Sequence, residues 1–276
     1  MRKLIYFFFF AVVLILASCT YYQFHLESRS TVENKQPQGI SVEEAPDFKA
    51  IKNLAQRKHA FFSYLKPGIR YENQRTQKER DFLLNSRKGI ESGQLSQAEV
   101  QQLAELSLLY SVKIPVEGPD LVWLDRMLHK VDVLPEALVL IQAANESAWG
   151  TSRFAREANN YFGQWCYQKG CGLVPLARET GMTHEVAKFK SVQESIHRYF
   201  INVNRNRAYR ELRNIRYQLR NEGEDLFSNQ SAIQLTNGLT KYSERGVDYV
   251  KSLQAMVRHN QKYWEDAPEE APKTVK

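Results

Sequence analysis

Cysteine is scarce in this sequence: only Cys19, Cys166 and Cys171 occur in 276 residues. A structural zinc site needs four ligands in a tetrahedral shell, and Cys166 and Cys171 have neither a third thiol nor a histidine nearby to complete one. The sequence therefore predicts no metal site.

The motifs of other hydrolase classes are also missing. His184-Glu185 lacks the second histidine of a zinc-protease motif. The Gly-x-Ser-x-Gly elbow of serine hydrolases does not occur. We expect chemistry that needs neither a metal nor an organic cofactor.

Long apolar runs are absent except at the start, where one follows Arg2 and Lys3. This run is too short for a confident membrane span, which needs about 20 apolar residues, and a cationic start followed by such a run is typical of an export signal. The run ends in Leu16-Ala17-Ser18-Cys19, which resembles the lipobox of bacterial lipoproteins. We therefore predict a signal peptide over residues 1–19 with lipid on Cys19, in preference to an ordinary signal peptide.

The residue after Cys19 is Thr20 rather than aspartate, a choice that resembles the sorting pattern for the outer membrane. The predicted location is the cell envelope, on the periplasmic side of the outer membrane. That compartment is oxidising, so disulfides persist there. Cys166 and Cys171 then remain as a pair around a short loop in which Gly170 allows a tight turn, and we predict that they form a disulfide.

The net charge of +7 and the pI near 9.2 suit a polyanionic partner. Export argues against nucleic acid and leaves lipid headgroups and the carboxylates of peptidoglycan stem peptides. The alternative is that scattered lysines and arginines only solvate helix surfaces.

Composition divides the chain into a tether and a globular part. Residues 20–54 are polar, contain Pro37, Gly39 and Pro46, and predict a flexible tether. Helical spacing of apolar residues predicts amphipathic helices at 55–66 and 72–89, and Ser96 with Glu99 forms a capping box for a third that ends near residue 110. These helices make up an N-terminal helical region, 55–117.

Gly118-Pro119-Asp120 breaks the pattern and predicts a boundary, after which a second domain covers 118–266 and a polar tail covers 267–276. Pro135 begins an apolar helix that continues to residue 148. A short β-hairpin is expected around Gly181, with residues 185–190 as its return strand, and helices resume at 192–219 and 246–263.

Glu146 lies in the last turns of this apolar helix, which puts its carboxyl at the edge of the core. Burial disfavours a charged carboxylate, and Trp149, three residues further on, shields Glu146 if both lie on one helical face. Cleavage of a glycosidic bond needs such an acid to protonate the leaving oxygen. A glutamate at a helix end is more often a solvated residue or a cap.

The segment around Glu146 resembles the bacterial glucosaminidase family, which is related to the flagellar muramidase. The resemblance is carried by Glu146-Ser147 with Trp149, followed by Asn159-Asn160-Tyr161-Phe162-Gly163. It is closest to the Bax-type branch, which also matches Phe61-Phe62-Ser63-Tyr64-Leu65, Gln164-Trp165-Cys166 and Cys171-Gly172. It covers residues 55–264.

This resemblance implies an α+β, predominantly helical, lysozyme-like fold with a small hairpin beside a groove. It implies that Glu146 is the general acid and that Asn160, Phe162 and Gly163 line the groove, with Ser147 and Trp149 beside them. Tyr242-Ser243 matches a later Tyr-Ser motif that shapes the site, although Glu244-Arg245-Gly246 replaces the usual Asp-Pro continuation.

A base or nucleophile must act on the other face of the sugar. The resemblance implies that a second carboxylate, where one exists, lies on the hairpin, which makes Glu185 the first candidate and Glu179 the second. Glu194 is better explained as the start of a helix. Substrate-assisted catalysis by the N-acetyl group would need no such carboxylate.

The expected function is hydrolysis of peptidoglycan glycan strands by an endo-β-N-acetylglucosaminidase. The alternatives are a muramidase, a lytic transglycosylase, or a non-catalytic scaffold that binds the wall. The expected partners are glycan strands and, through the lipid on Cys19, the membrane.

Overall fold

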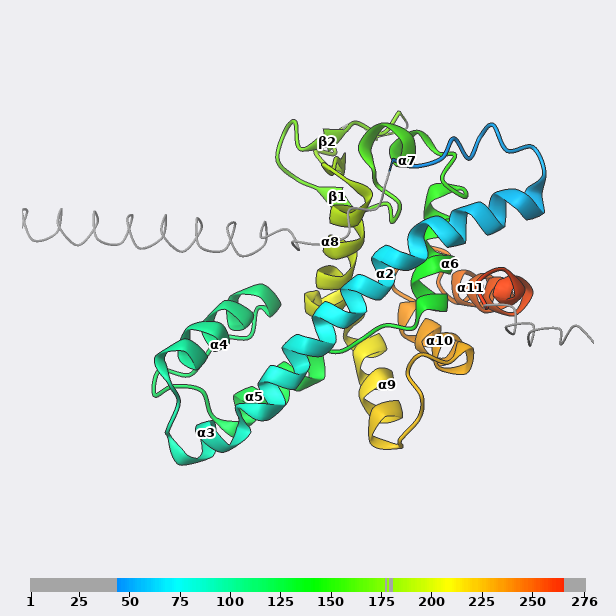
Figure 1. Ribbon diagram of the computed structural model, residues 1–276. Helices are drawn as coiled ribbons and strands as arrows, with labels where there is room; N and C mark the ends of the chain where they lie inside the picture. The colour runs from blue at the N-terminus through cyan, green and yellow to red at the C-terminus, as the bar shows by residue number, and fades with distance from the viewer. Residues whose placement is uncertain (1–43, 177, 179–180, 266–276) are drawn as a thin grey trace, which may run out of the picture.

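The computed structural model describes residues 44–176, 178 and 181–265 (Figure 1). The predicted signal peptide with Cys19, residues 20–43 of the tether and the tail from 267 lie outside this part of the chain. Within it, no helix is both long enough and apolar enough to cross a membrane.

The centre of the fold is α6 (Glu136–Ser147), the apolar helix that the sequence predicts. All residues from 137 to 144 are buried, as expected for a helix that is hydrophobic on every side. It is packed by α2 (Leu54–Asn85), α10 (Asn229–Thr236) and α11 (Val247–Asn260), and α2 also contacts α8 (Val192–Arg205). The end of α6 is therefore held from several sides.

The two helices predicted at 55–66 and 72–89 are instead one long helix, α2, and the prediction of a break was wrong. Pro67 lies inside α2 and is exposed. A proline within a helix costs about 3 kcal/mol, but fully burying a large apolar side chain gains about 1.5–3 kcal/mol each. Phe62 and Leu65 before the proline and Ile69 after it are all buried, so packing on both sides outweighs the lost hydrogen bond.

A second hydrophobic cluster forms between the C-terminal part of α2 and α3 (Arg87–Ser92), α4 (Gln97–Tyr110) and α5 (Leu121–Lys130). The capping box of Ser96 and Glu99 at the start of α4 is confirmed. This cluster includes Leu83 and Trp123, which lie on either side of Gly118. Helix α2 contributes to both clusters, while the predicted domain limits themselves stay a prediction.

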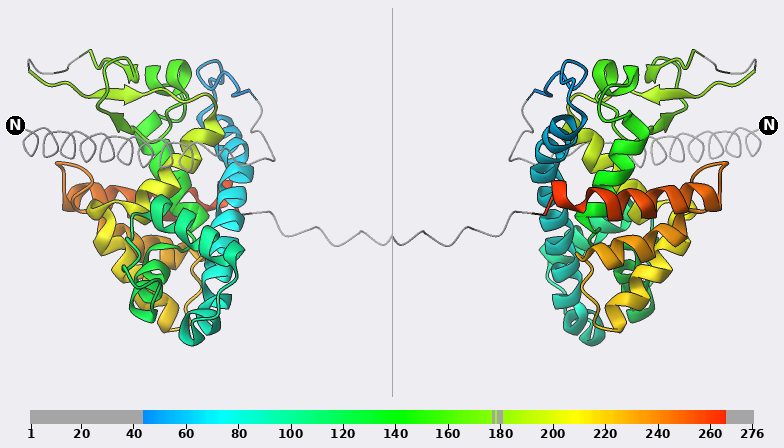
Figure 2. Two further views of the ribbon diagram at one scale, coloured as in Figure 1. Left: turned by 90° about the vertical axis from the view of Figure 1, so that its left-hand side faces the viewer. Right: turned by 90° about the vertical axis from the view of Figure 1, so that its right-hand side faces the viewer.

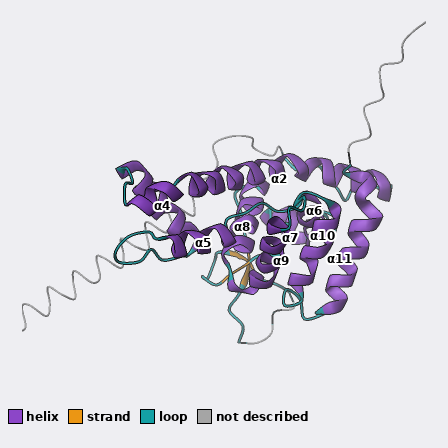
Figure 3. Cartoon of the chain, turned by 90° about the horizontal axis from the view of Figure 1, so that it is seen from below, coloured by secondary structure: helices purple, strands orange, loops and turns teal. Residues whose placement is uncertain are grey.

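The strands form one small antiparallel sheet of β1 (Trp165–Cys166), β3 (Glu185–Ala187) and β2 (Gly172–Leu173), with β3 in the middle. The hairpin expected around Gly181 corresponds to β2 and β3, and β1 adds a strand that was not expected. A Cβ on Gly172 would lie 1.9 Å from the carbonyl oxygen of Val186, so the pairing requires glycine there. The predicted fold class, mostly helical with a small β element, is confirmed (Figure 3).

The remaining elements are α7 (Arg153–Ala158), η1 (Arg207–Tyr209), α9 (Arg210–Asn221), η2 (Asn237–Leu239) and η3 (Gln261–Tyr263). The helical stretch predicted at 192–219 is α8, η1 and α9, interrupted where the Asn206 side chain accepts a hydrogen bond from the backbone of Ala208. The sheet and α7 lie at one end of the molecule and α3 to α5 toward the other (Figures 1 and 2).

Candidate active site

Glu146 lies in the last turn of α6, half-buried, as the sequence predicts. The helix ends abruptly because Ala148, Trp149 and Gly150 all have positive φ. Gly150 is needed for space as well, since a Cβ there would lie 2.4 Å from the Phe48 ring. The turn exposes the end of α6 and fixes the Glu146 backbone.

The two oxygens of Glu146 have different surroundings. Oε1 accepts hydrogen bonds from Asn145 Nδ2 at 3.0 Å and from the Tyr249 hydroxyl of α11 at 2.9 Å. Oε2 has no hydrogen-bond partner in the described part of the chain, and a Cβ on Gly163 would lie 3.5 Å from it. One oxygen is thus held in place while the other faces the backbone of Gly163.

A chain of hydrogen bonds leads from the interior to Glu146. The Tyr199 hydroxyl donates to Gln142 Oε1, and Gln142 Nε2 lies 3.3 Å from the Tyr249 hydroxyl oxygen, which accepts. Tyr249 then donates to Glu146. The Tyr249 oxygen accepts from Gln142, so its hydrogen is left to point at the Glu146 carboxyl group. Hydrogen bonds that are linked in this way strengthen one another in a low-dielectric interior.

Four tyrosines surround this carboxyl. Burial, followed by neighbouring charges that include Glu146, raises the pKa of Tyr199, Tyr209, Tyr242 and Tyr249 well above the usual value. All four stay protonated at neutral pH and can act as hydrogen-bond donors. The Tyr242 ring stacks on Tyr249 with 5.4 Å between centroids, and its hydroxyl donates to the carbonyl oxygen of Phe162 at 3.0 Å.

The segment 159–163 has a positioning role in this structure. The Asn160 side chain is 1% exposed and makes four hydrogen bonds, to the backbones of Phe162, Gln164 and Ala187. The Phe162 ring is also buried and stacks on Tyr199 at 4.2 Å. The expectation that these two side chains line the groove is corrected, because buried side chains cannot contact a substrate; they place the Gly163 backbone beside Glu146.

Ser147 likewise faces inward. It is fully buried, and its hydroxyl accepts a hydrogen bond of 2.9 Å from the backbone N–H of Gly150. It therefore stabilises the turn after α6, and the expected contact with substrate is corrected.

Trp149 is not on a helical turn with Glu146, because α6 ends at Ser147. Its ring packs against Phe61 and Phe62 of α2, and Lys58 Nζ lies 5.0 Å above it. The shared-face argument was wrong for this reason. A substrate-binding role for Trp149 stays a prediction.

Both carboxylate oxygens of Glu185 accept hydrogen bonds from the backbone. Its Oε1 accepts from the backbone N–H of Gly170 at 3.0 Å and its Oε2 from that of Gly172 at 2.8 Å. These bonds lower the pKa of its carboxyl. The geometry gives Glu185 a structural role and argues against its use as the second catalytic carboxylate.

The other two acidic candidates differ. Glu179 lies outside the described residues. Glu194 accepts a hydrogen bond from the backbone of Lys190 at 2.8 Å, and its own N–H donates to Ser191, so it caps α8 as expected.

The disulfide between Cys166 and Cys171 is confirmed. Together with Glu185 these residues form a group close enough to suggest metal ligands, but the disulfide leaves neither sulfur as a thiolate. Beside the bridge, Trp165 and Tyr167 are exposed and Trp165 stacks on His184 at 4.1 Å. These rings are available to a sugar face.

Sequence reasoning missed the partners of Glu146. Gln142 lies four residues before it on α6, a spacing that places both on one helical face, so this residue could have been found. Tyr249 lies 103 residues away and Tyr209 belongs to the η1 segment. No local pattern connects either of them to Glu146.

Comparisons of the sequence with known proteins identify a family. The sequence model of a family described as mannosyl-glycoprotein endo-beta-N-acetylglucosaminidase matches residues 123–262, which include both α6 and α11. The chain is similar to Protein bax from Escherichia coli (strain K12), at 33% identity over 217 residues, covering 79% of this chain and 74% of that protein. No solved structure matches.

Proposed function

Because this chain belongs to the glucosaminidase family, we propose that it hydrolyses the glycan strands of peptidoglycan, as an endo-β-N-acetylglucosaminidase with Glu146 as general acid. The observation that carries the proposal is the asymmetry of the Glu146 carboxyl. Oε1 is held by Asn145 and Tyr249, so Oε2, the oxygen that has no bond within the described residues, is the one placed to transfer a proton to a substrate.

The reaction follows from this arrangement. Glu146 Oε2 gives its proton to the glycosidic oxygen as the bond from that oxygen to the anomeric carbon breaks, and the leaving sugar departs as an alcohol. A water molecule then adds to the anomeric carbon and returns a proton to Glu146. The proton donated and the proton recovered balance, and no metal or cofactor takes part.

The second catalytic group, in this proposal, is the substrate's own acetamido oxygen. Glu185 has both carboxylate oxygens bound to backbone N–H groups, so it is poorly placed to attack a sugar. Attack by the acetamido oxygen on the anomeric carbon forms a cyclic oxazolinium ion, which water opens. A thiazoline analogue of N-acetylglucosamine should inhibit the enzyme competitively; no inhibition at millimolar concentration would argue for a protein carboxylate instead.

The test of the main proposal is digestion of purified peptidoglycan by a soluble form beginning at Tyr21, beside Glu146→Gln, with reducing ends identified by mass spectrometry. Loss of a general acid is expected to lower the rate about 100-fold or more. Reducing-end N-acetylglucosamine that disappears in the variant supports the glucosaminidase. N-acetylmuramic acid or an anhydro sugar would instead indicate a muramidase or a lytic transglycosylase, and binding without cleavage by the wild type would indicate a scaffold.

The proposed site of action is the envelope, with the protein anchored through lipid on Cys19 at the outer membrane. This part of the proposal depends on the sequence of residues 1–20 alone. The wild type should sediment with outer membranes, and Cys19→Ala should not carry the lipid. Release of both into the soluble periplasm would contradict the anchor.

A further inference from the structure

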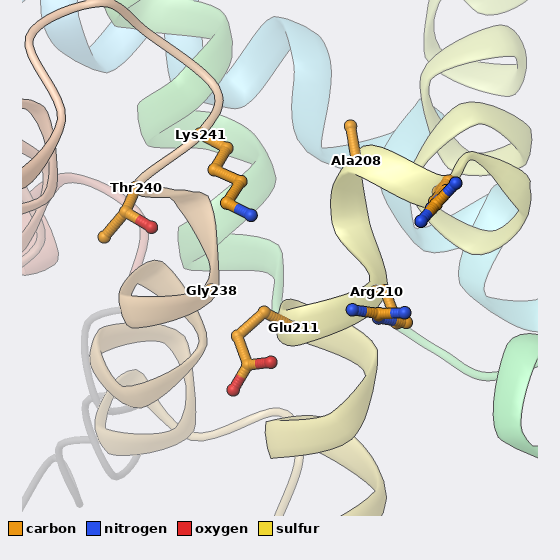
Figure 4. A pocket seen from close by; sticks show the side chains of 7 residues that line it. Ala208, Arg210, Glu211, Gly238, Thr240 and Lys241 are labelled. Carbon is orange, nitrogen blue, oxygen red and sulfur yellow. The ribbon is translucent and has the colours of Figure 1, made fainter.

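A cavity of about 390 Å³ lies between the start of α9 and the segment after η2 (Figure 4). Its charged lining residues are Arg207, Arg210, Glu211 and Lys241, and we call it the cationic cavity. Lys241 and Arg210 face this space from opposite walls (Figure 4). A Cβ on Gly238 would lie 2.3 Å from the Leu212 backbone, so η2 is pressed against α9 and the two walls are fixed.

The cations of the cavity have no partners in the described chain. Arg207, Arg210 and Lys241 are exposed and make no side-chain hydrogen bond or ion pair among residues 44–176, 178 and 181–265. The carboxylate of Glu211 accepts a bond from Asn214 Nδ2 at 3.3 Å. Three cations around one carboxylate leave a surplus of positive charge in a concave place.

The cavity adjoins the tyrosines around Glu146. Tyr209 is the residue just before Arg210, and Tyr242 is the residue just after Lys241. The two tyrosine rings lie 5.9 Å apart, and each feels the charge of Glu146. The walls of the cavity are therefore continuations of the backbone that forms the candidate active site.

The positive surface continues beyond Arg210. This residue also lines a larger cavity of about 660 Å³ with Lys130 and Arg213. Burial and the neighbouring Arg213 and Arg205 lower the pKa of Lys130 to about 8. Lys130, Arg210 and Arg213 place further positive charge beside the cationic cavity.

We propose that the cationic cavity binds carboxylates of the peptide stems carried by the glycan strand while Glu146 acts on that strand. This inference rests on the proposed function and adds the substrate class: strands that still bear their stems. Arginine and lysine bind carboxylates through charge-assisted hydrogen bonds. A cavity with fixed walls admits single groups projecting from a polymer, whereas a bilayer presents a flat surface.

The test measures binding to insoluble peptidoglycan by co-sedimentation, with Glu146→Gln as the parent chain so that the ligand survives. The variant is Arg210→Gln with Lys241→Gln, and the matched control is Lys251→Gln with Arg258→Gln, two exposed cations of α11 that line neither cavity. Three ligands are compared: intact peptidoglycan, peptidoglycan with its carboxyls capped as neutral amides by carbodiimide and methylamine, and strands stripped of stems by an amidase and coupled to beads, because they no longer carry cross-links. Thermal unfolding checks that all chains fold alike.

The expected result is a loss of about three- to fivefold in affinity of the cavity variant for intact peptidoglycan at low salt. The control variant should lose less affinity for intact peptidoglycan. The loss in the cavity variant should become smaller at high salt, because screening weakens exposed charge pairs. On capped and on stripped ligand, parent and cavity variant should bind alike. Equal losses in control and cavity variant, or a loss that persists on capped ligand, would overturn the proposal.

Two further outcomes would also contradict it. Stripped strands bound as tightly as intact ones would indicate the lactyl carboxylate of the sugar, and a loss seen on phosphatidylglycerol vesicles but not on peptidoglycan would indicate a membrane surface. Because binding is read without cleavage, failure here is distinct from failure of Glu146 as the acid.

Discussion

The Tyr249 hydroxyl lies 2.9 Å from Glu146 Oε1 and donates a hydrogen bond to it, joining α11 to the end of α6 across 103 residues of sequence. With Asn145 on the same oxygen, this bond fixes the rotation of the carboxyl group. Because Oε1 is fixed, Oε2 is turned toward Gly163. Substitutions at Tyr249, beside Oε1, and at Gly163, beside Oε2, both test this orientation.

Replacing Tyr249 by phenylalanine removes the donor and keeps the ring that stacks on Tyr242. As Glu146 gives up its proton, this becomes a hydrogen bond to a charged group, which contributes about 1.5–3 kcal/mol, so the cleavage rate should fall about 10- to 100-fold. Initial rates of peptidoglycan digestion measure it. Tyr263→Phe, which removes a hydroxyl with no hydrogen bond among the described residues, should cleave like the wild type; equal loss in both would discount the bond.

Gly163→Ala tests the other side of the carboxyl. Its φ of 62° strains alanine by about 1–2 kcal/mol, and the new methyl would contact Glu146 Oε2. Gly93→Ala is the matched control, with φ of 67° and nothing within 4 Å of the added Cβ. Both should lower stability similarly, but only Gly163→Ala should lower the cleavage rate, by about tenfold or more. A comparable rate loss in Gly93→Ala would mean that strain alone is responsible.

Glu185→Gln separates a structural carboxylate from a catalytic one. The variant places an amide N–H, a donor, against the N–H donor of Gly170 or Gly172, so one of these hydrogen bonds is lost. The loop should then loosen, and dithiothreitol should reduce the Cys166–Cys171 disulfide faster than in the wild type. Its cleavage rate at pH 7 should fall by less than the about 100-fold expected for losing a catalytic acid or base. Abolished cleavage with an intact loop would restore Glu185 to the mechanism.

The same bonds set a pH dependence. They lower the pKa of the folded Glu185 carboxyl below its unfolded value of about 4.3, so its stabilisation is present above that pH and is lost as the pH falls through the folded value. The stability advantage of wild type over Glu185→Gln should therefore shrink from pH 7 toward pH 3, as chemical denaturation would measure. A constant difference would contradict this account.

Asp132→Asn should destabilise the fold strongly. Asp132 is 2% exposed, pairs with Arg220 through both carboxylate oxygens and lies 3.4 Å from Arg80. Removing the charge of a buried carboxylate costs about 3–5 kcal/mol, because Arg80 remains buried and uncompensated. Asp125→Asn, which breaks an exposed pair with Arg87 at 3.1 Å, should cost only about 0–1 kcal/mol. Denaturant unfolding of both variants gives the comparison.

The sequence was sufficient for features that depend on neighbouring residues. The Ser96–Glu99 capping box, the apolar helix that carries Glu146 and the disulfide all follow from local patterns, and the structure has each of them. The family resemblance added the fold class, because its motif spans segments that local patterns cannot connect.

What could not be predicted depends on tertiary packing. The spacing of apolar residues predicted two helices, at 55–66 and 72–89, but burial on both sides of Pro67 joins them in one helix. The resemblance implied that Asn160 lines the groove, yet its side chain is buried because the surrounding backbone satisfies its hydrogen bonds. Glu185 was a catalytic candidate because of its place on the hairpin. No local pattern shows that the N–H groups of Gly170 and Gly172, earlier in the chain, bind its carboxylate.

Helix α2 runs without interruption from the second cluster of helices to Phe61 and Phe62, which pack on Trp149, three residues after Glu146. At about 1.5 Å of rise per residue, the 32 residues of α2 span about 48 Å. One helix therefore supplies Leu83 to the second cluster and Phe62 to the turn behind the acid. A substitution that shifts α2 against α3 to α5 would also displace the support of the Glu146 turn.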